Sequence, residues 1–349
     1  MKKQKMFILF LIVALIAGTF IACGGNQPAQ PAQPGAPDVP APEPQVTLRF
    51  ASLMAETSQL GITKRIFRDL VESRSENITV QLFYNGILGN ESELCESVSA
   101  GSIDIVSVGS GIQIHLPNAA IMEAPFLFDS LEQANMIFQD PRFIELHTRG
   151  AAENNIVPLG YFPFGNRVVF ADRPIRNMSE LQALRIRIPN IPLWLQIWDS
   201  IGANYVALPL SELVPALEQG VIDGQDGPVN QTITNGSYEL SSYVIMTNHM
   251  MANQLWLINS DSLGSLSPQN QQIILDSARE AIQTAWSLFE AELNEELAYL
   301  ETVMTVITPD ESFLQDMRDA VVAVYEWFET QAPNGREILD LVAAIKQGN

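Results

Sequence analysis

The side chains that could do chemistry in this chain are three histidines, two cysteines and a large excess of carboxylates. His115, His147 and His249 lie far apart and lack the close spacing of a metal site. No GxSxG, P-loop or GxGxxG signature occurs. With 40 acidic residues against 19 basic ones, paired carboxylates carry little information. Cys95 lies in a helical pattern (ESELCESVSA) with no partner cysteine available, so we expect a core thiol and not a nucleophile.

Length and charge set broad limits on the protein class. The 349 residues are 47% apolar, which suits one large or two medium globular domains. A net charge of −21 leaves no cationic surface to neutralise nucleic-acid phosphates or to hold an anionic membrane. Any membrane contact must therefore come from something other than charge.

The N-terminus supplies such a contact. Lys2, Lys3 and Lys5 precede the apolar run FILFLIVALIA (7–17), which is typical of a secretory signal. Phe20-Ile21-Ala22-Cys23 resembles a lipobox, where bacterial lipoprotein signal peptidase cuts before a diacylated cysteine, although Leu is commoner than Phe at its first position. The alternative is an uncleaved anchor, but residues 6–22 are short for about 30 Å of hydrocarbon. We therefore expect cleavage of residues 1–22 and lipidation of Cys23.

The segment after Cys23 cannot form a core. Residues 24–45 hold seven of the chain's 21 prolines and no aromatic residue. Such a composition predicts a solvated polyproline-like tether with a reach of roughly 3 Å per residue. A lipid at one end and a globular body at the other indicate an extracytoplasmic protein tethered to a bacterial membrane, at the periplasm or the cell surface.

From Val46 the chain alternates strand and helix patterns, which predicts an α/β fold. One lobe begins as βαβ, and a second begins with a strand at NRVVFA (166–171). We expect strands at 46–53, 78–84, 103–109, 156–162, 185–189 and 244–258, and helices near 62–71, 91–100, 130–154 (two), 178, 211–219, 311–331 and 336–346.

A long helix is predicted in the C-terminal third. Ser267 can cap it, and Pro268 suits the first helical position because its missing N–H has no partner there anyway. Apolar residues then recur every three or four positions from Ile274 to Leu300. Some 37 residues at about 1.5 Å each give roughly 55 Å, so this helix should pack against both lobes.

Several motifs in the second half occur together in one order. They are LRIRIPN (184–190), IGA (201–203), LSEL (210–213), ALEQG (216–220) and VIDGQD (221–226), with GNR (165–167) before them and MTNH (246–249) and NQL (253–255) after them. In order and spacing they resemble the DctP family, the substrate-binding proteins of tripartite ATP-independent periplasmic (TRAP) transporters. The resemblance covers about residues 46–302. It implies a two-lobed clamshell, of the type II periplasmic-binding class, that closes on a small organic acid.

The resemblance also assigns site residues. Arg187 falls on the family's carboxylate clamp, and a guanidinium suits that role because it makes two parallel charge-assisted hydrogen bonds to a carboxylate. Arg185 alternates with Arg187 on one strand and should point the other way. Arg167 falls on a second cleft arginine, and Asp226 either contacts the ligand or holds an arginine, the role we favour. Asn190 and Gln254 fall on polar contact positions.

Three departures from the family pattern bear on the ligand. Gly109 and Gly227 stand where the sialic-acid-binding branch has an acidic side chain and an amide, and Leu210 replaces an expected aromatic residue. Aromatic residues near the motifs, Phe164 among them, would line a less polar cleft. We therefore expect a monocarboxylate with an apolar or aromatic body in preference to a sugar acid.

The sequence thus predicts a binding protein, not an enzyme, with no cofactor or metal. Its partners would be a small organic acid and the permease subunits of a TRAP transporter. Residues 46–164 with about 253–290 would form one lobe, and 165–252 with about 291–349 the other. The alternatives are a receptor of the same fold that serves a sensor or another transporter, and a surface lipoprotein without a transport role.

Overall fold

The computed structural model describes residues 43–348. The predicted signal, Cys23 and most of the predicted tether lie outside the described residues. A compact unit begins at Pro44, close to the predicted start of the body at Val46. Among the described residues, no helix is both long and apolar enough to cross a bilayer.

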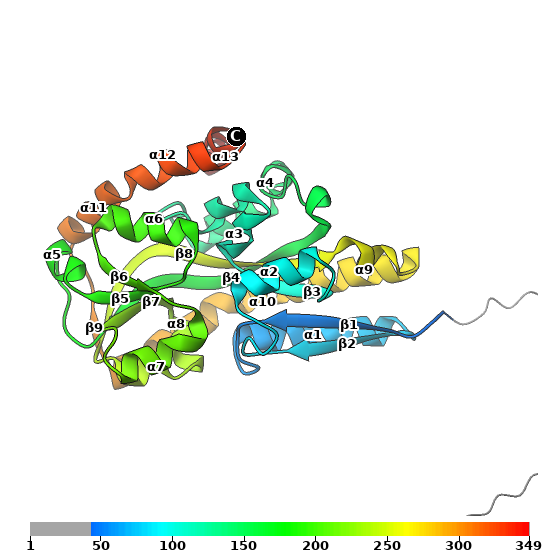
Figure 1. The fold of residues 1–349 in the computed structure, drawn as a ribbon, viewed down its shortest axis with the longest axis horizontal. Helices are drawn as coiled ribbons and strands as arrows, with labels where there is room; N and C mark the ends of the chain where they lie inside the picture. Colours follow the sequence, from blue (N-terminus) through cyan, green and yellow to red (C-terminus); the bar gives the residue numbers. More distant parts are fainter. Residues whose placement is uncertain (1–42, 349) are drawn as a thin grey trace, which may run out of the picture. The chain divides into compact units, whose positions relative to one another are not determined.

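One nine-stranded sheet runs through this unit (Figure 1). Its strands follow the order β2-β1-β3-β8-β4-β7-β5-β6, and β9 pairs with β8. The strands are β1 (Val46–Ser52), β2 (Ile78–Phe83), β3 (Ile105–Val108), β4 (Ile156–Ala171), β5 (Arg185–Ile188), β6 (Asn204–Ala207), β7 (Gly224–Pro228), β8 (Tyr243–Asn259) and β9 (Thr305–Ile307).

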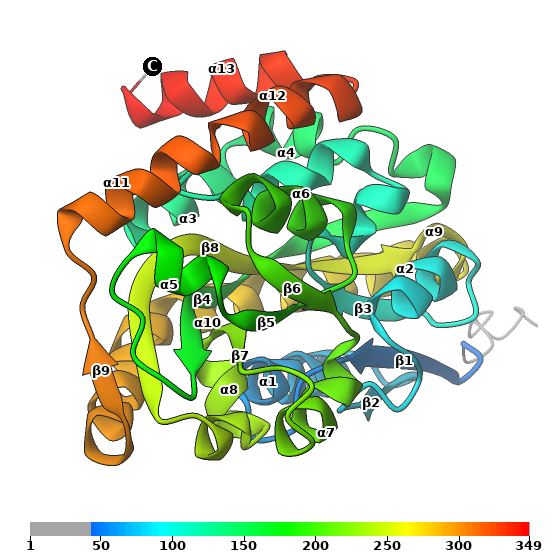
Figure 2. The same ribbon diagram turned by 60° about the vertical axis from the view of Figure 1, so that its left-hand side comes forward.

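The sheet has two parallel parts joined by two long strands. β1 pairs in parallel with β2 and β3, and β5 pairs in parallel with β6 and β7. Between these parts β4 and β8 run antiparallel to each other along most of their length (Figure 2). We call β1–β3 and the elements around them the first lobe, and β5–β7 and the elements around them the second lobe. The expected α/β fold with two lobes is confirmed.

The strand β4 replaces two separately predicted strands. Register shifts at Pro158/Gly160, Pro163/Gly165 and Arg167/Val169 bend it while its pairing with β8 continues. Gly165 has φ +99°, and a Cβ there would lie 3.3 Å from the Phe289 ring. Glycine is needed at this bend because other residues rarely adopt such a backbone conformation. Pairing with β8 therefore keeps β4 continuous through Pro163 and Gly165, which the sequence alone suggests as a strand break.

Helices cover both faces of the sheet (Figure 2). A single predicted helix at 311–331 is two helices, because the chain turns at Val321. The helices are α1 (Gln59–Arg74), α2 (Glu91–Ser99), α3 (Leu131–Gln139), α4 (Pro141–His147), α5 (Met178–Gln182), α6 (Pro192–Ile201), α7 (Leu213–Glu218), α8 (Val229–Thr234), α9 (Ser260–Gly264), α10 (Pro268–Val303), α11 (Glu311–Ala320), α12 (Val322–Gln331) and α13 (Gly335–Lys346), with short 3₁₀ helices that include η1 (Ser110–Ile114) and η2 (Pro117–Glu123).

The helix α10 confirms the long helix that the cap and the apolar stripe predict. The Ser267 side chain accepts a hydrogen bond from the backbone N–H of Asn270 at the helix start. The N-terminal half of α10, from Ile274 to Ala285, packs with α1 residues of the first lobe. Its C-terminal half, where Leu300 is buried, packs against Val168 and Val244 of β4 and β8 and against α8. One continuous helix thus contacts both lobes.

The C-terminal helices run along one side of the unit (Figure 1). α12 contacts α6, whereas α13 contacts α3 and α4. This end of the chain therefore touches elements of both lobes, and the division of the chain between lobes at residues 164, 252 and 290 stays a prediction. Cys95 lies on α2 and is fully buried in the core, as expected, and burial raises the pKa of its thiol well above the usual value.

Candidate functional site

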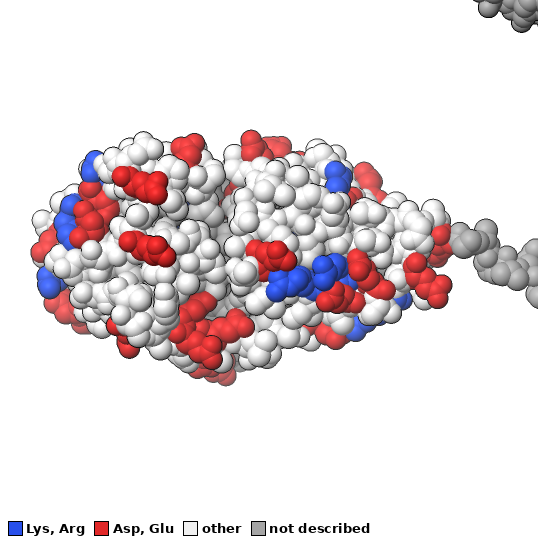
Figure 3. Space-filling view, turned by 90° about the horizontal axis from the view of Figure 1, so that it is seen from below, with Lys and Arg blue, Asp and Glu red and all other residues white. Residues whose placement is uncertain are grey.

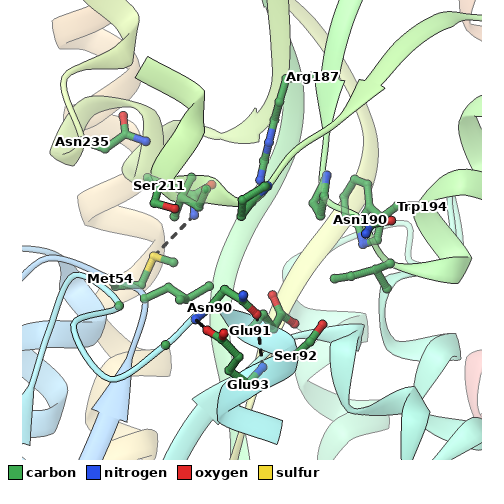
Figure 4. Close-up of a pocket in the computed structure, with 18 of the residues that line it drawn as sticks. Met54, Asn90, Glu91, Ser92, Glu93, Arg187, Asn190, Trp194, Ser211 and Asn235 are labelled. Carbon is green, nitrogen blue, oxygen red and sulfur yellow. Dashed lines mark hydrogen bonds between the residues drawn. The ribbon is translucent and has the colours of Figure 1, made fainter. Parts of the chain in front are cut away.

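A cavity of about 580 Å³ lies between the two lobes. Met54, Asn90 and Glu91 line it from the first lobe, and Arg187 and Trp194 line it from the second (Figure 4). Its size is that of a site for a small molecule.

Strand alternation on β5 decides which arginine reaches the cavity. Arg187 is only 3% exposed and lines the cavity, and its side chain points toward the start of α2 (Figure 4). The Arg185 side chain is 44% exposed and pairs with Asp223, with 2.9 Å between Nε and Oδ2. The two side chains leave opposite faces of the strand, as the sequence predicts.

The Arg187 guanidinium has no carboxylate partner among residues 43–348. Its Nε and Nη2 both donate to the backbone carbonyl of Leu208, at 3.0 and 2.7 Å. Burial, and after it the like charge of Arg167, lowers the pKa of Arg187 to about 9. The group is therefore still protonated at neutral pH, and it is a buried cation at the wall of the cavity.

Among the described residues, Arg167, unlike Arg187, forms an ion pair with a buried carboxylate, that of Asp226. On the neighbouring strands β4 and β7, its Nε donates to Oδ1 of Asp226 at 3.0 Å and its Nη2 to the Asp226 carbonyl at 2.9 Å. Its guanidinium lies 4.1 Å from the centre of the Trp194 ring, a cation–π contact. Arg167 thereby lines the cavity in one orientation, between an acid and an indole.

Asp226 is placed to position Arg167. It is fully buried and is not among the residues that line the cavity. Burial alone would raise its pKa, but Arg167 and His249 outweigh burial and hold the pKa of Asp226 below its ordinary value. His249 Nε2 lies 3.4 Å from Asp226 Oδ1, and its Nδ1 is hydrogen-bonded to Thr247 at 2.8 Å. The sequence analysis missed this support by His249, because residues 226 and 249 meet only across the sheet.

Six of the nine predicted ligand-binding residues line the cavity. They are Arg187, Arg167, Asn190, Gln254, Leu210 and Phe164. Asp226, Gly109 and Gly227 do not line it, although all three are buried close to residues that do.

The two glycines do not themselves remove polar groups from this region, and the lower polarity expected of the cleft as a whole stays a prediction. A Cβ at Gly109 would lie 3.2 Å from Oε1 of both Glu91 and Glu123. A Cβ at Gly227 would lie 3.1 Å from Oγ1 of Thr232. Side chains from other elements occupy the space that a side chain at each glycine would need, so the residue type at one position does not report the polarity of the site.

Glu123 and Glu91 are the main groups that the sequence analysis missed. Oε2 of Glu123 accepts hydrogen bonds from the backbone N–H of Ser110 at 3.2 Å and from Nε1 of Trp194 at 3.3 Å. The same Oε2 atom also accepts a hydrogen bond from the Ser110 hydroxyl. Burial raises the pKa of Glu123 although Arg167 opposes the shift. The bond to Trp194 also connects the two lobes directly.

Glu91 is the first residue of α2. Oε1 of Glu91 accepts a hydrogen bond from the backbone N–H of Gly111 at 3.0 Å. Burial, and after it the charge of Glu123, raises the pKa of Glu91 to about 7. The one sequence signal for its position is the capping box of Asn90 and Glu93, which starts a helix at the carboxyl end of a strand, where ligand sites of α/β sheets occur.

The outer surface of the protein is predominantly acidic. Acidic side chains outnumber basic ones on the face in Figure 3, as the net charge of −21 implies. The arginines of the cleft lie inside the molecule, where low dielectric strengthens the effect of a charge.

A two-lobed α/β fold with a buried cleft between the lobes defines a solute-binding protein of the periplasmic type. The DctP profile, described as bacterial extracellular solute-binding protein, family 7, matches residues 50–331. The chain belongs to this family, and the resemblance seen in its motifs is confirmed.

Named relatives share most of the chain. The ectoine-binding periplasmic protein TeaA of Halomonas elongata is 28% identical over 300 residues, 84% of this chain and 87% of that protein. A TRAP periplasmic solute-binding protein of Desulfovibrio desulfuricans, solved with sn-glycerol-3-phosphate, is 25% identical with a TM-score of 0.83, over 86% of this chain and 97% of the other. One from Roseobacter denitrificans, solved with L-galactonate, is 26% identical with a TM-score of 0.78, over 86% and 99%.

Proposed function

We propose that this chain is an extracytoplasmic solute-binding protein that captures a small organic acid through Arg187 and delivers it to the membrane permease of a TRAP transporter. The observation that carries the proposal is a buried guanidinium that forms no ion pair with a carboxylate of residues 43–348 and lines a cavity of about 580 Å³. A buried unpaired cation is costly, and a ligand carboxylate would compensate it. The relatives solved with L-galactonate and sn-glycerol-3-phosphate support an anionic ligand.

The proposed role is binding and release without chemical conversion. Family members are solute-binding proteins, which supports this role. The polar groups of the cleft are held by neighbours in fixed orientations, as Arg167 is by Asp226 and Glu123 by Ser110. Fixed donors and acceptors of this kind suit recognition of one ligand geometry.

The proposal predicts that freshly purified protein carries a small acid. Native mass spectrometry should detect an added mass that is lost on denaturation, and Arg187→Gln protein prepared in parallel should lack it. Arg185→Gln protein is the matched control and should retain the adduct. An adduct that persists unchanged in the Arg187 variant would contradict capture through this residue.

We also propose that Cys23 is lipidated and holds the protein at a bacterial membrane. The lipobox-like sequence and the proline-rich residues after it support this proposal, and the compact unit that begins at Pro44 would be the ligand-binding body. Cells grown with labelled palmitate should incorporate label into the wild-type protein and none into the Cys23→Ser variant. The Cys95→Ser variant should be labelled as wild type, and label in Cys23→Ser would refute the anchor.

A further inference from the structure

The cleft has charges of opposite sign on its two sides. Arg187 extends from β5 of the second lobe, and Glu91 begins α2 of the first lobe on the facing side of the cavity (Figure 4). Both side chains line the cavity, so a bound molecule can contact both.

Among residues 43–348, neither group forms an ion pair with a side chain of opposite charge, although Glu91 and Asp226 lie close enough to Arg187 to oppose the lowering of its pKa. Arg187 donates to the Leu208 carbonyl, and Glu91 accepts from the backbone N–H of Gly111. No described Lys, Arg or His forms an ion pair with Glu91. The nearby arginine, Arg167, is already paired with Asp226. Within the described part of the chain, one cation and one anion of the cleft therefore have no ion-pair partner.

Glu123 increases the negative charge on the side of Glu91. Oε1 atoms of both residues lie 3.2 Å from the Cβ position of Gly109, so the carboxyl groups are neighbours. Glu123 is 4% exposed and has hydrogen bonds from Ser110 and Trp194, which leaves Glu91 as the member of the pair available to a ligand. A ligand with only a carboxylate would compensate Arg187 and add a further negative charge near this pair.

We propose that the ligand is a zwitterion, whose carboxylate binds Arg187 and whose cationic nitrogen binds Glu91. This inference rests on the proposed function and specifies the class of acid. A dipolar ligand compensates the charges of Arg187 and Glu91 at once, and complementarity of this kind gives specificity. The raised pKa of Glu91 supports the assignment, because an unliganded cleft disfavours its ionised form and a bound cation would favour it.

The test compares small acids that carry a cationic nitrogen with small acids that lack one. Calorimetric titration would use L-pipecolate and ectoine as zwitterions, cyclohexanecarboxylate as the counterpart without nitrogen, and D-galactonate as a hydroxylated acid. At least one zwitterion should bind about tenfold or more tightly than both cyclohexanecarboxylate and D-galactonate. Tighter binding of D-galactonate than of either zwitterion would overturn the inference, because neutral hydroxyl donors would then satisfy Glu91.

Variants separate this inference from the proposed function. Glu91→Gln keeps an oxygen for the Gly111 N–H and removes the charge, so it should lose about tenfold or more in zwitterion affinity and leave cyclohexanecarboxylate binding nearly unchanged. Glu96→Gln, on the same helix with a side chain 69% exposed, should behave as wild type. Equal zwitterion affinity in Glu91→Gln would overturn the inference alone. If no acid binds, or Arg187→Gln binds every acid as wild type does, the proposed function fails as well.

Discussion

Replacing Arg187 by glutamine should weaken ligand binding more than any other single change in the cleft. Removal of the guanidinium would leave a desolvated carboxylate unpaired, at a cost of about 2 to 5 kcal/mol in binding free energy. That cost is roughly 30-fold to several thousand-fold in affinity. Calorimetric titration with the acid identified in the purified protein measures it.

Two conservative changes separate the guanidinium from its charge. Arg187→Lys keeps a cation but has no second donor for a bidentate bond, and it cannot reproduce the two bonds to Leu208, so we expect it to lose much of the affinity. Arg185→Lys on the opposite face of β5 should change little, because Arg185 is half-exposed and pairs with Asp223. Equal losses at both arginines would indicate bulk electrostatics, and no loss at Arg187 would refute the clamp.

Removing the Asp226 carboxylate should destabilise the folded protein strongly. Asp226 and Arg167 form a buried ion pair with side chains 0% and 6% exposed, and Asp226→Ala leaves Arg167 uncompensated. Breaking such a pair costs about 3 to 5 kcal/mol in the free energy of unfolding. Urea unfolding followed by circular dichroism measures this loss, and a loss below about 1 kcal/mol would contradict the role given to the pair.

The matched control is an exposed ion pair on α10. Asp276 pairs with Arg279 through side chains 44% and 62% exposed, so Asp276→Ala should cost no more than about 1 kcal/mol.

The pH dependence of stability provides a second comparison. Because the folded pKa of Asp226 is lowered, its stabilisation is present above the unfolded value of about 3.9 and is lost as pH falls through the folded value. The stabilities of wild type and Asp226→Asn should therefore converge in acid.

Local signals in the sequence correctly predicted several elements. Ser267, Pro268 and the apolar stripe predicted α10 nearly to its bounds, because caps and helical periodicity act over a few neighbouring residues. Alternation along RIRIP separated Arg185 from Arg187 for the same reason. Such signals failed where a partner strand decided the outcome, as in β4, where pairing with β8 continues through Pro163 and Gly165.

The charges of the cleft were only partly visible in the sequence. Motif order identified Arg187 and Arg167 by resemblance, and the structure places both at the cavity. Glu91 and Glu123 had no such signal, because 40 acidic residues make any one carboxylate unremarkable. Glu91 at the start of α2 and Glu123 at the end of η2 are separated in the chain, and both lie beside Gly109 only in the folded protein.

The sequence by itself therefore determined the α/β class, the long helix, the family and the arginine that faces the cleft. Each of these depends on periodicity, caps or motifs that neighbouring residues carry. The tertiary structure decided which carboxylates lie across the cavity from Arg187, that Asp226 and His249 support Arg167, and that Arg187 forms no ion pair within residues 43–348. These depend on burial and on contacts between distant segments, and burial is what makes a charge without an ion-pair partner costly.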